Sequence, residues 1–525
     1  MSAQTAAVIP HASADEKYAI EGIEDVEQSD KPDEGRQVVV TAEDDKRIRR
    51  KTDRYLLSLL VWVYFLQIYD KTVFGYGNTY GLSTDLGLVK RQYSLLSSMT
   101  SIATLAWQPF SAYIIVRVNH RYFMTVCVFC WGTAAACMAA SNGYGSILAC
   151  RFLLGLFEAA NIPLFSMITS TWYRRSEQPL RVCAWFIQNS SATIIAALIS
   201  YGFGHIESES WRPWQSIYLS AGLITVFTAP LIWFRLPADY SEAKFFENEY
   251  EREQAIERLR ANQTGGGSRN FRWTHVKEMF MDPKSWVFAA LVCIPNMGAH
   301  VANTFGPTLI KGFGFEPKVA TLLNIPFGVM QAIGIFFGSY GAYRFKYKSI
   351  PLVVLTLVAL AGAIMLYIAN TKSKVQLGLA LAGYYLGGAL FGVSPVVYSW
   401  TIANVGGQTK KSTMLSFMNI GTATGQMTGP LLLNAVDAPR YLPGLRSLMI
   451  SQGLLVCCVG LQVVVIYLSN KRHRARRAAA GKTEQVHDIS MDRNYNQVPA
   501  AGASANNAGD QDLTDWENED FVYVY

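Results

Sequence analysis

The chain has 525 residues, of which 50% are hydrophobic and only 16% are charged, against about 25% charged residues in an ordinary soluble domain. Several stretches run for about 20 residues with few or no charges, which is enough to cross a hydrocarbon core of roughly 30 Å. These features exclude a soluble globule, a coiled coil and a collagen, and such long apolar runs exclude an outer-membrane barrel. The net charge of +7 sits in short basic runs between apolar stretches, so it indicates membrane topology rather than nucleic-acid binding.

In chain order, the polar and acidic residues 1–54 are predicted to be a disordered tail. Twelve apolar segments follow and predict an all-α membrane protein with twelve transmembrane helices in two six-helix halves, 55–236 and 285–470. A polar linker, 237–284, separates the halves, and 471–525 is predicted to be a second disordered tail. The segments are 55–78, 93–116, 122–141, 146–171, 182–204, 216–236, 285–310, 319–341, 350–369, 375–402, 413–434 and 447–469.

A weak internal repeat supports the two halves. Gly155 and Pro163 in the fourth segment recur at one common offset as Gly387 and Pro395 in the tenth. Equivalent positions in both halves indicate a parallel repeat. Glycines spaced by four residues in the eighth and eleventh segments let helices approach closely, and we expect them to form the seam between the halves. These glycines are Gly334, Gly338, Gly421, Gly425 and Gly429.

The basic residues of the short loops are unequally divided between the two sides of the membrane. Most lie on the side that also holds both tails and the linker, which predicts that this side is cytoplasmic. The basic loop residues on that side are Arg117, Arg121, Arg174, Arg175, Arg181, Arg344, Lys346, Lys348, Lys410 and Lys411.

Apart from Arg235 at the very end of the sixth segment, only Asp70, Lys71, Arg151 and Glu158 are charged within the twelve segments, and all four belong to the first half. An unpaired charge at the centre of a membrane helix costs about 2.5–3.5 kcal/mol, so these residues must be paired or hydrated. Arg151 and Glu158 share one helix face about 10 Å apart and need partners elsewhere. One arrangement pairs Asp70 with Arg151 and Lys71 with Glu158.

Two interpretations of these charges remain open. One is a static ion-pair clamp between the first and fourth segments. The other, which we favour, is a central cavity that binds an anion and a proton. Lys71 and Arg151 would hold the anion, and Asp70 and Glu158 would exchange protons, because an apolar surrounding favours a neutral carboxyl group. Other polar residues of the segments are expected mostly to hydrogen-bond between helices, with His300 and Asn303 retained as candidate substrate contacts.

Several motifs together resemble the anion:cation symporter family of the major facilitator superfamily, most closely the fungal allantoate permease group. They are Tyr69–Asp70–Lys71 with Gly75–Tyr76, Arg151 to Gly155 and on to Glu158 and Pro163, and Trp172–Tyr173 with Glu177–Gln178 and Arg181. The resemblance implies proton coupling through Asp70 and Glu158 and anion contact through Lys71 and Arg151. By the same analogy, Gln188 and Asn419 are candidate substrate contacts.

These observations predict a proton-coupled symporter that imports a small organic anion, such as a carboxylate vitamin or a ureide, across the plasma membrane by alternating access. The alternatives are a transporter-like nutrient sensor and an efflux exchanger. The sequence contains no nucleophile–base set, nucleotide loop or metal cluster, so we expect no enzyme activity, no cofactor and no metal. All eight cysteines lie in apolar segments and are interpreted as packing residues. The expected partners are the anion, the proton and lipid, without nucleic acid, and the expected state is a monomer with both termini in the cytoplasm.

Overall fold

The computed structural model describes residues 38–88, 90–203, 211–238, 242–260, 271–312, 319, 322–345, 347–371, 376–432, 442–481 and 512–525. The chain divides into Met1–Val39 and Val40–Tyr525, and every helix given below belongs to the second unit. Its described residues form helices and no strand, which confirms the predicted all-α class.

The helices of the first half pack mainly against one another. α6 contacts α11 and α7, α5 contacts α7, and α3 contacts α10 and α11. A short α4 follows α3. The bounds are α3 Ser58–Thr79, α4 Leu82–Asp85, α5 Lys90–Arg117, α6 His120–Met138, α7 Tyr144–Glu158, α8 Asn161–Trp172, α9 Gln178–Phe186, α10 Gln188–Phe203 and α11 Pro213–Arg235.

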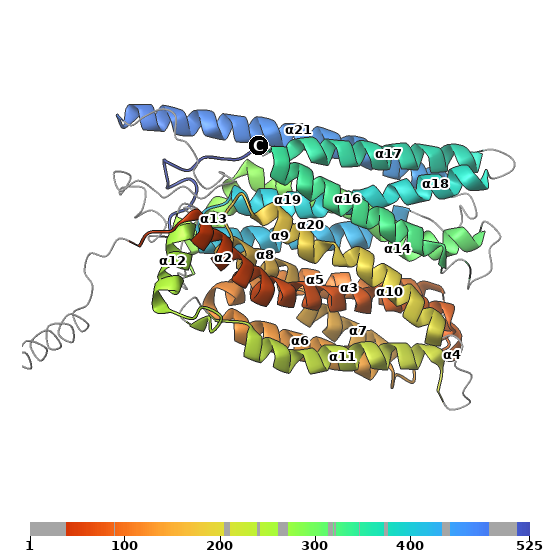
Figure 1. The fold of residues 1–525 in the computed structure, drawn as a ribbon. Coiled ribbons are helices and arrows are strands. Elements are labelled where there is room, and N and C mark those ends of the chain that lie inside the picture. Colours follow the sequence, from red (N-terminus) through yellow and green to blue (C-terminus); the bar gives the residue numbers. More distant parts are fainter. Residues whose placement is uncertain are drawn as a thin grey trace, which may run out of the picture. The chain divides into compact units, whose positions relative to one another are not determined.

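The second half has the same kind of packing. α14 contacts α20 and α21, α17 contacts α18 and α21, and α16 packs on a 3-10 turn, Gly388–Gly392. Figure 1 shows these helices running side by side, with α14, α16, α17, α18 and α21 above α3, α6, α10 and α11 of the first half. The bounds are α14 Pro283–Gly312, α16 Asn324–Phe345, α17 Ser349–Thr371, α18 Leu377–Gly387, α19 Val393–Ala403, α20 Gln408–Leu432 and α21 Leu442–Ala479.

Most of the described residues of each predicted transmembrane segment are helical. In the described part of the chain, nine helical runs are long and apolar enough to cross a membrane. α5, α14 and α20 are not in that set, and each contributes polar side chains to the cavity between the halves. On the outer surface the exposed side chains include large apolar ones such as Phe227 and Phe234, as expected for helices surrounded by lipid.

The fourth segment of each half is a broken helix. α7 ends at Glu158 and α8 begins at Asn161, while α18 ends at Gly387 and α19 begins after the 3-10 turn. Pro163 and Pro395 stand close to the start of α8 and α19. The repeat seen in the sequence therefore marks equivalent helix breaks, and the first of them directly follows Glu158.

The prediction that the spaced glycines form the seam between the halves is wrong. A Cβ at Gly421, Gly425 or Gly429 would meet the backbone of α14, and one at Gly334 would meet that of Ala389. All of these contacts lie inside the second half. Small residues permit close helix approach anywhere in a bundle, so their spacing does not identify the partner helix. A seam glycine does exist at Gly328, which abuts Ser190 and Ile194 of α10.

At one end of the bundle lie α2 (Ala42–Thr52), α12 (Glu249–Arg260) and α13 (Trp273–Met281), and we call it the linker end (Figure 1). The expectation that 1–54 is wholly disordered fails for α2. Thr41 and Asp44 form a capping box at its start, and a π-helical turn, Asp53–Leu57, joins it to α3. Its acidic and basic residues are ordered by ion pairs with α12, which composition does not reveal.

The expectation that 471–525 is disordered also fails in two places. α21 continues to Ala479, and residues 512–525, which we call the 512–525 segment, pack against the linker end with Phe521 and Tyr523 buried. A polar composition predicts disorder only when no surface receives the chain. Here the bundle supplies such a surface.

Candidate functional site

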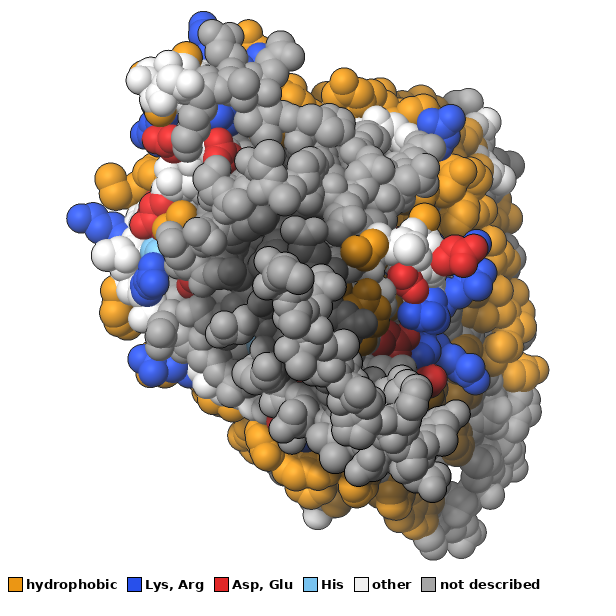
Figure 2. Space-filling view, turned by 60° about the vertical axis from the view of Figure 1, so that its left-hand side comes forward, with side chains coloured by type: hydrophobic (Ala, Val, Ile, Leu, Met, Phe, Trp, Pro, Cys, Tyr) orange, Lys and Arg blue, Asp and Glu red, His pale blue; other side chains and the backbone are white. Residues whose placement is uncertain are grey.

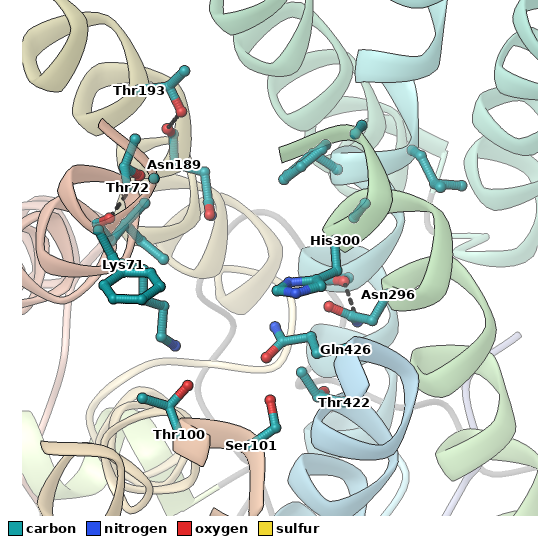
Figure 3. A pocket seen from close by; sticks show the side chains of 18 of the residues that line it. Lys71, Thr72, Thr100, Ser101, Asn189, Thr193, Asn296, His300, Thr422 and Gln426 are labelled. Carbon is teal, nitrogen blue, oxygen red and sulfur yellow. Dashed lines mark hydrogen bonds between the residues drawn. The ribbon is translucent and has the colours of Figure 1, made fainter. Parts of the chain in front are cut away.

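A cavity of about 440 Å³ lies between the two halves. Figure 3 shows Lys71 entering it from α3, Thr100 and Ser101 from α5, and His300 and Gln426 from the helices of the other half. Its polar lining residues are Lys71, Thr72, Ser97, Thr100, Ser101, Arg151, Asn189, Thr193, Asn296, His300, Asn324, Ser394, Thr422 and Gln426. A volume of this size suits a small-molecule ligand.

An ion pair at the cavity joins α3 to the end of α7. Lys71 Nζ lies 2.6 Å from Glu158 Oε1, and the Lys71 side chain is 34% exposed whereas that of Glu158 is 3% exposed. Gln67 Nε2 donates to the same carboxylate oxygen at 2.8 Å, while no described residue bonds Glu158 Oε2. The pair predicted between Lys71 and Glu158 is therefore present, with the ammonium group on the cavity side.

Arg151 lies at the cavity wall, and none of the carboxylates in the described part of the chain pairs with it. Its guanidinium carbon lies 3.9 Å from the centre of the Phe74 ring, and its Nε donates to the Leu96 carbonyl at 3.4 Å. The side chain is buried, and its Nη1 has no hydrogen-bond partner among the residues that the structure describes. A buried guanidinium with an unused donor is strongly disposed to bind an oxyanion, because an unsatisfied charged donor is costly.

Asp70 is buried outside the set of cavity-lining residues. Trp131 of α6 donates its indole N–H to Asp70 Oδ2, and Asp70 Oδ1 has no partner within the described ranges. No ion pair joins Asp70 to Arg151, although both side chains are described. Of the two ion pairs considered from the sequence, only the one between Lys71 and Glu158 is present. At Asp70 the indole of Trp131 is the partner in place of Arg151.

The wall contributed by the second half is neutral and partly aromatic. Asn296 and His300 project from α14, and Thr422 and Gln426 from α20 (Figure 3). Deeper in that wall, Tyr384 donates to Asn324 Oδ1 at 2.8 Å and stacks on Phe327 at a centroid distance of 4.6 Å. Cationic groups on one side and neutral donors, acceptors and rings on the other can together hold a polar anion with an unsaturated body.

The amino-acid sequence matches a family model described as "Major Facilitator Superfamily" over residues 60–430. This chain belongs to the major facilitator superfamily. Members of this superfamily are membrane transporters, and the protein is a transporter rather than an enzyme. The superfamily assignment accounts for the two packed halves and for a cavity between them.

Two relatives of this superfamily protein come from Saccharomyces cerevisiae. It is 27% identical to an allantoate permease, over 94% of this chain and 89% of the relative. It is also 27% identical to a high-affinity nicotinic acid transporter, over 84% of this chain and 81% of the relative. Among solved structures, the proton:xylose symporter XylE matches with a TM-score of 0.63 at 13% identity, covering 79% of this chain and 96% of that one, a likeness that concerns the fold alone.

The other predicted site residues of this superfamily chain are distributed unevenly. His300 lines the cavity. Asn419 is buried and donates to the Ala159 carbonyl at 2.7 Å, so it bridges the halves beside the break after α7. Gln188 donates to Ala184 within its own helix region at 3.5 Å and is not among the lining residues. The side chain of Asn303 lies outside the described residues.

Several lining residues escaped the prediction, and a simple spacing signal would have found them. Asn189 and Thr193 on α10 lie four residues apart, as do Asn296 and His300 on α14. The same spacing relates Thr422 to Gln426 on α20. Polar pairs at this spacing in an apolar helix share one face, and that face points to the cavity in each case.

The two halves meet closely on the linker side of the cavity. Ser412 at the start of α20 donates to the Ala112 carbonyl of α5 at 2.9 Å, and the hydroxyls of Ser111 and Ser416 lie 3.4 Å apart. Arg175, between α8 and α9, donates to the Ala403 carbonyl at the end of α19. The structure thus represents a state closed at the linker end.

Charged residues also gather at the linker end, and Figure 2, with that end turned forward, shows acidic and basic side chains together on the described surface. Arg258 of α12 bonds Glu177 at 2.7 Å and Asp45 of α2 at 2.8 Å. Burial alone would raise the pKa of Glu177, but Arg258 and then Arg181 and Arg49 lower it below its usual range. This group ties α2 and α12 to the loop before α9.

Proposed function

We propose that this transporter is a proton-coupled symporter that imports a small organic anion. The observation that supports it most is Arg151, a buried guanidinium on the cavity wall with an Nη1 donor that has no partner. Lys71, partly exposed at the same wall, supplies a second cation. Two cations beside a neutral opposite wall favour an anionic substrate.

A carboxylate is the group that best fits this pair of cations. A guanidinium offers a planar fork that matches a carboxylate, and an ammonium group adds a point charge. Two relatives are named for allantoate and nicotinic acid, which are both carboxylates at neutral pH. We propose that His300 and its neighbours on α14, with Asn303 among them, hold the body of the substrate.

Proton coupling would follow from competition for Lys71. In the structure Glu158 Oε1 lies 2.6 Å from Lys71 Nζ. A bound anion would draw Lys71 away, and a buried carboxylate left without its cation binds a proton more readily. Protonated Glu158 is neutral, so no unpaired carboxylate would remain buried when the loaded transporter changes conformation. Asp70 would be a second proton site.

The direction of transport would follow from topology. Most basic loop residues are predicted to lie on the linker side, which we propose is cytoplasmic. Because the halves are closed there, the structure then corresponds to an outward-facing state. A cell-surface importer that works by alternating access would load its substrate in this state.

The test is uptake by purified protein in proteoliposomes, using radiolabelled carboxylates, ureides and vitamins. An inward proton gradient should drive accumulation of one of these compounds, and the accumulation should collapse when a protonophore is added. Accumulation that ignores the gradient would remove the proton-coupling claim. Binding without accumulation would instead indicate the sensor alternative.

A further inference from the structure

The 512–525 segment occupies a binding site at the linker end. Asp515 is fully buried and forms two ion pairs. Its Oδ2 lies 2.6 Å from Lys284 Nζ, and its Oδ1 lies 2.8 Å from Lys410 Nζ. Although burial alone would raise it, the two lysines hold the pKa of Asp515 well below its usual range, with Lys284 contributing first. A carboxylate placed between two buried ammonium groups anchors this segment to α14 and α20.

Backbone hydrogen bonds extend the anchor along the segment. Asn404, just after α19, accepts from the Val524 N–H at 2.7 Å and donates to the Val524 carbonyl at 3.0 Å. Asn470 of α21 makes the same two-way contact with Tyr523 at 3.0 Å each way. Trp400 also donates to the Val524 carbonyl at 2.7 Å. Such paired contacts resemble those of a strand and specify one register.

The receiving surface has room for the segment because two residues before α20 lack side chains. A Cβ at Gly406 would lie 2.8 Å from the Asp515 backbone nitrogen, and Gly407 adopts a φ of 78°, where L side chains are strained. The Gly406 N–H donates to Asp515 Oδ1 at 3.2 Å. The turn between α19 and α20 is therefore shaped to the segment that covers it.

The segment also reaches the first half. Arg175 Nη2 donates to the Val522 carbonyl at 3.1 Å, and its guanidinium lies 4.7 Å from the centre of the Phe521 ring. The same guanidinium donates to Ala403 of the second half. Because the segment is anchored on the second half, its contact with Arg175 links the two halves at the end that must open in the transport cycle.

We propose that the 512–525 segment is a releasable latch, which binds across the linker end and keeps it closed until the segment departs. This inference rests on alternating access and not on the identity of the substrate or on proton coupling. Release of the segment would remove the bond and the ring contact at Arg175 and leave fewer contacts between the halves. The equilibrium would then shift toward a state open at the linker end.

The test measures opening at a site away from the segment. Ser412 becomes the reporter as Ser412→Cys, in a chain whose native cysteines are replaced, because its hydroxyl contacts Ala112 across the halves. The rate of maleimide labelling is followed for purified protein in nanodiscs, without substrate. Failure of the uptake experiment therefore leaves this measurement unaffected.

Thr514→Glu is the main variant, because Thr514 Oγ1 lies 2.9 Å from Glu278 Oε2 and a carboxylate there would repel the segment. Phe521→Ala, which removes only the ring beneath Arg175, is the second. The expected result is a labelling rate raised about tenfold by Thr514→Glu and less by Phe521→Ala. Thr514→Ser, which keeps the hydroxyl that bonds Glu278, is the matched control and should stay near the parent rate.

A synthetic peptide with the sequence of residues 512–525 should return the Thr514→Glu protein to slow labelling. Size-exclusion profiles and melting temperatures establish that each variant is folded. Parent-like labelling in folded Thr514→Glu and Phe521→Ala proteins would overturn the latch. Fast labelling that the peptide does not reverse would also overturn it, since the change would then come from damage rather than from an emptied site.

Discussion

Buried charged side chains lie both at the cavity and at the linker end. Arg151 and Glu158 at the cavity differ from Arg258 and Glu177 at the linker end in how completely their polar atoms are paired. At the linker end, Arg258 bonds both Glu177 and Asp45, and no buried polar atom of Arg258 or Glu177 lacks a partner. At the cavity, Arg151 Nη1 and Glu158 Oε2 have none. Burial is similar for these four side chains, so incomplete pairing is what distinguishes Arg151 and Glu158 from Arg258 and Glu177.

This contrast separates charges that stabilise the fold from charges that await a partner. Removing one member of a buried, satisfied pair leaves an uncompensated charge and destabilises the protein. Removing an incompletely paired cation from the cavity relieves the free-energy cost of burying it and abolishes a contact with the substrate. The experiments below test this division, beginning with the largest expected effect.

Arg151→Gln should reduce uptake of the substrate by about 100-fold or more, because a buried charge-assisted contact with the anion is lost. Its melting temperature should equal or exceed that of the parent. The measurement is initial uptake in proteoliposomes together with a thermal melt. Arg151→Lys serves as the matched variant and should retain part of the activity. A large loss of thermal stability would place Arg151 among the structural charges.

Glu158→Gln should abolish proton-driven accumulation while preserving exchange of labelled for unlabelled substrate, because a neutral amide mimics the protonated acid permanently. Accumulation and exchange are measured on the same proteoliposomes at several pH values. Gln67→Leu, which removes a neutral hydrogen-bond donor from the same carboxylate, is the control and should keep coupling. Retained accumulation in Glu158→Gln would move the proton site elsewhere, with Asp70 the next position to vary.

Arg258→Ala should lower the free energy of unfolding by about 3–5 kcal/mol, since it leaves Glu177 and Asp45 buried without their cation. Ligand binding at the cavity should persist in the protein that remains folded. Arg47→Ala is the matched control. Its side chain is 55% exposed, so the loss should stay within about 1 kcal/mol. Equal effects of the two substitutions would contradict the pairing argument.

The linker end should weaken in acid. The pKa values of Glu177 and Asp515 are lowered in the folded protein, so their stabilisation is complete above the ordinary carboxyl range and is lost progressively as the pH falls from that range through the lowered values of the folded state. The melting temperature should therefore decline below about pH 5. Glu177→Gln should flatten part of that decline. A decline unchanged in this variant would assign the acid sensitivity to other carboxyl groups.

The smallest effect is expected at Gln188. Its side chain bonds within its own helix region and does not line the cavity, so Gln188→Ala should change the uptake KM by about twofold at most. Asn189→Ala, at a lining position that also donates to Tyr64, should have the larger effect on KM. The reverse order would show that the cavity rearranges on substrate binding.

The sequence predicted the helical class, the approximate helix positions and the presence of charged side chains within the helix bundle, because apolar runs and isolated charges are strong signals in a membrane protein. The partners of those charges were less accessible. The link between Lys71 and Glu158 was predicted, but the indole of Trp131 at Asp70 was not. A tryptophan in an apolar segment is read from the sequence as a packing residue, so the hydrogen bond from its indole N–H to a carboxylate cannot be predicted.

The errors have a common physical origin. Gly421 and its neighbours were assigned to the wrong interface, and the polar sequence around Asp515 was assigned to a disordered tail. Each depends on which surface lies opposite, and local composition does not contain that information. Such surfaces are created by residues far apart in the chain, as Lys284 and Lys410 show for Asp515.

The interruption between α7 and α8 has a mechanical consequence. The Ala159 carbonyl, next in the chain to Glu158, accepts one amide from Gln108 of the first half at 2.8 Å and another from Asn419 of the second half at 2.7 Å. When the halves rock apart, the second of these bonds must stretch or break. The backbone beside Glu158 is thereby bonded to the second half, so a movement of the second half relative to the first would displace the residue that we expect to carry the proton.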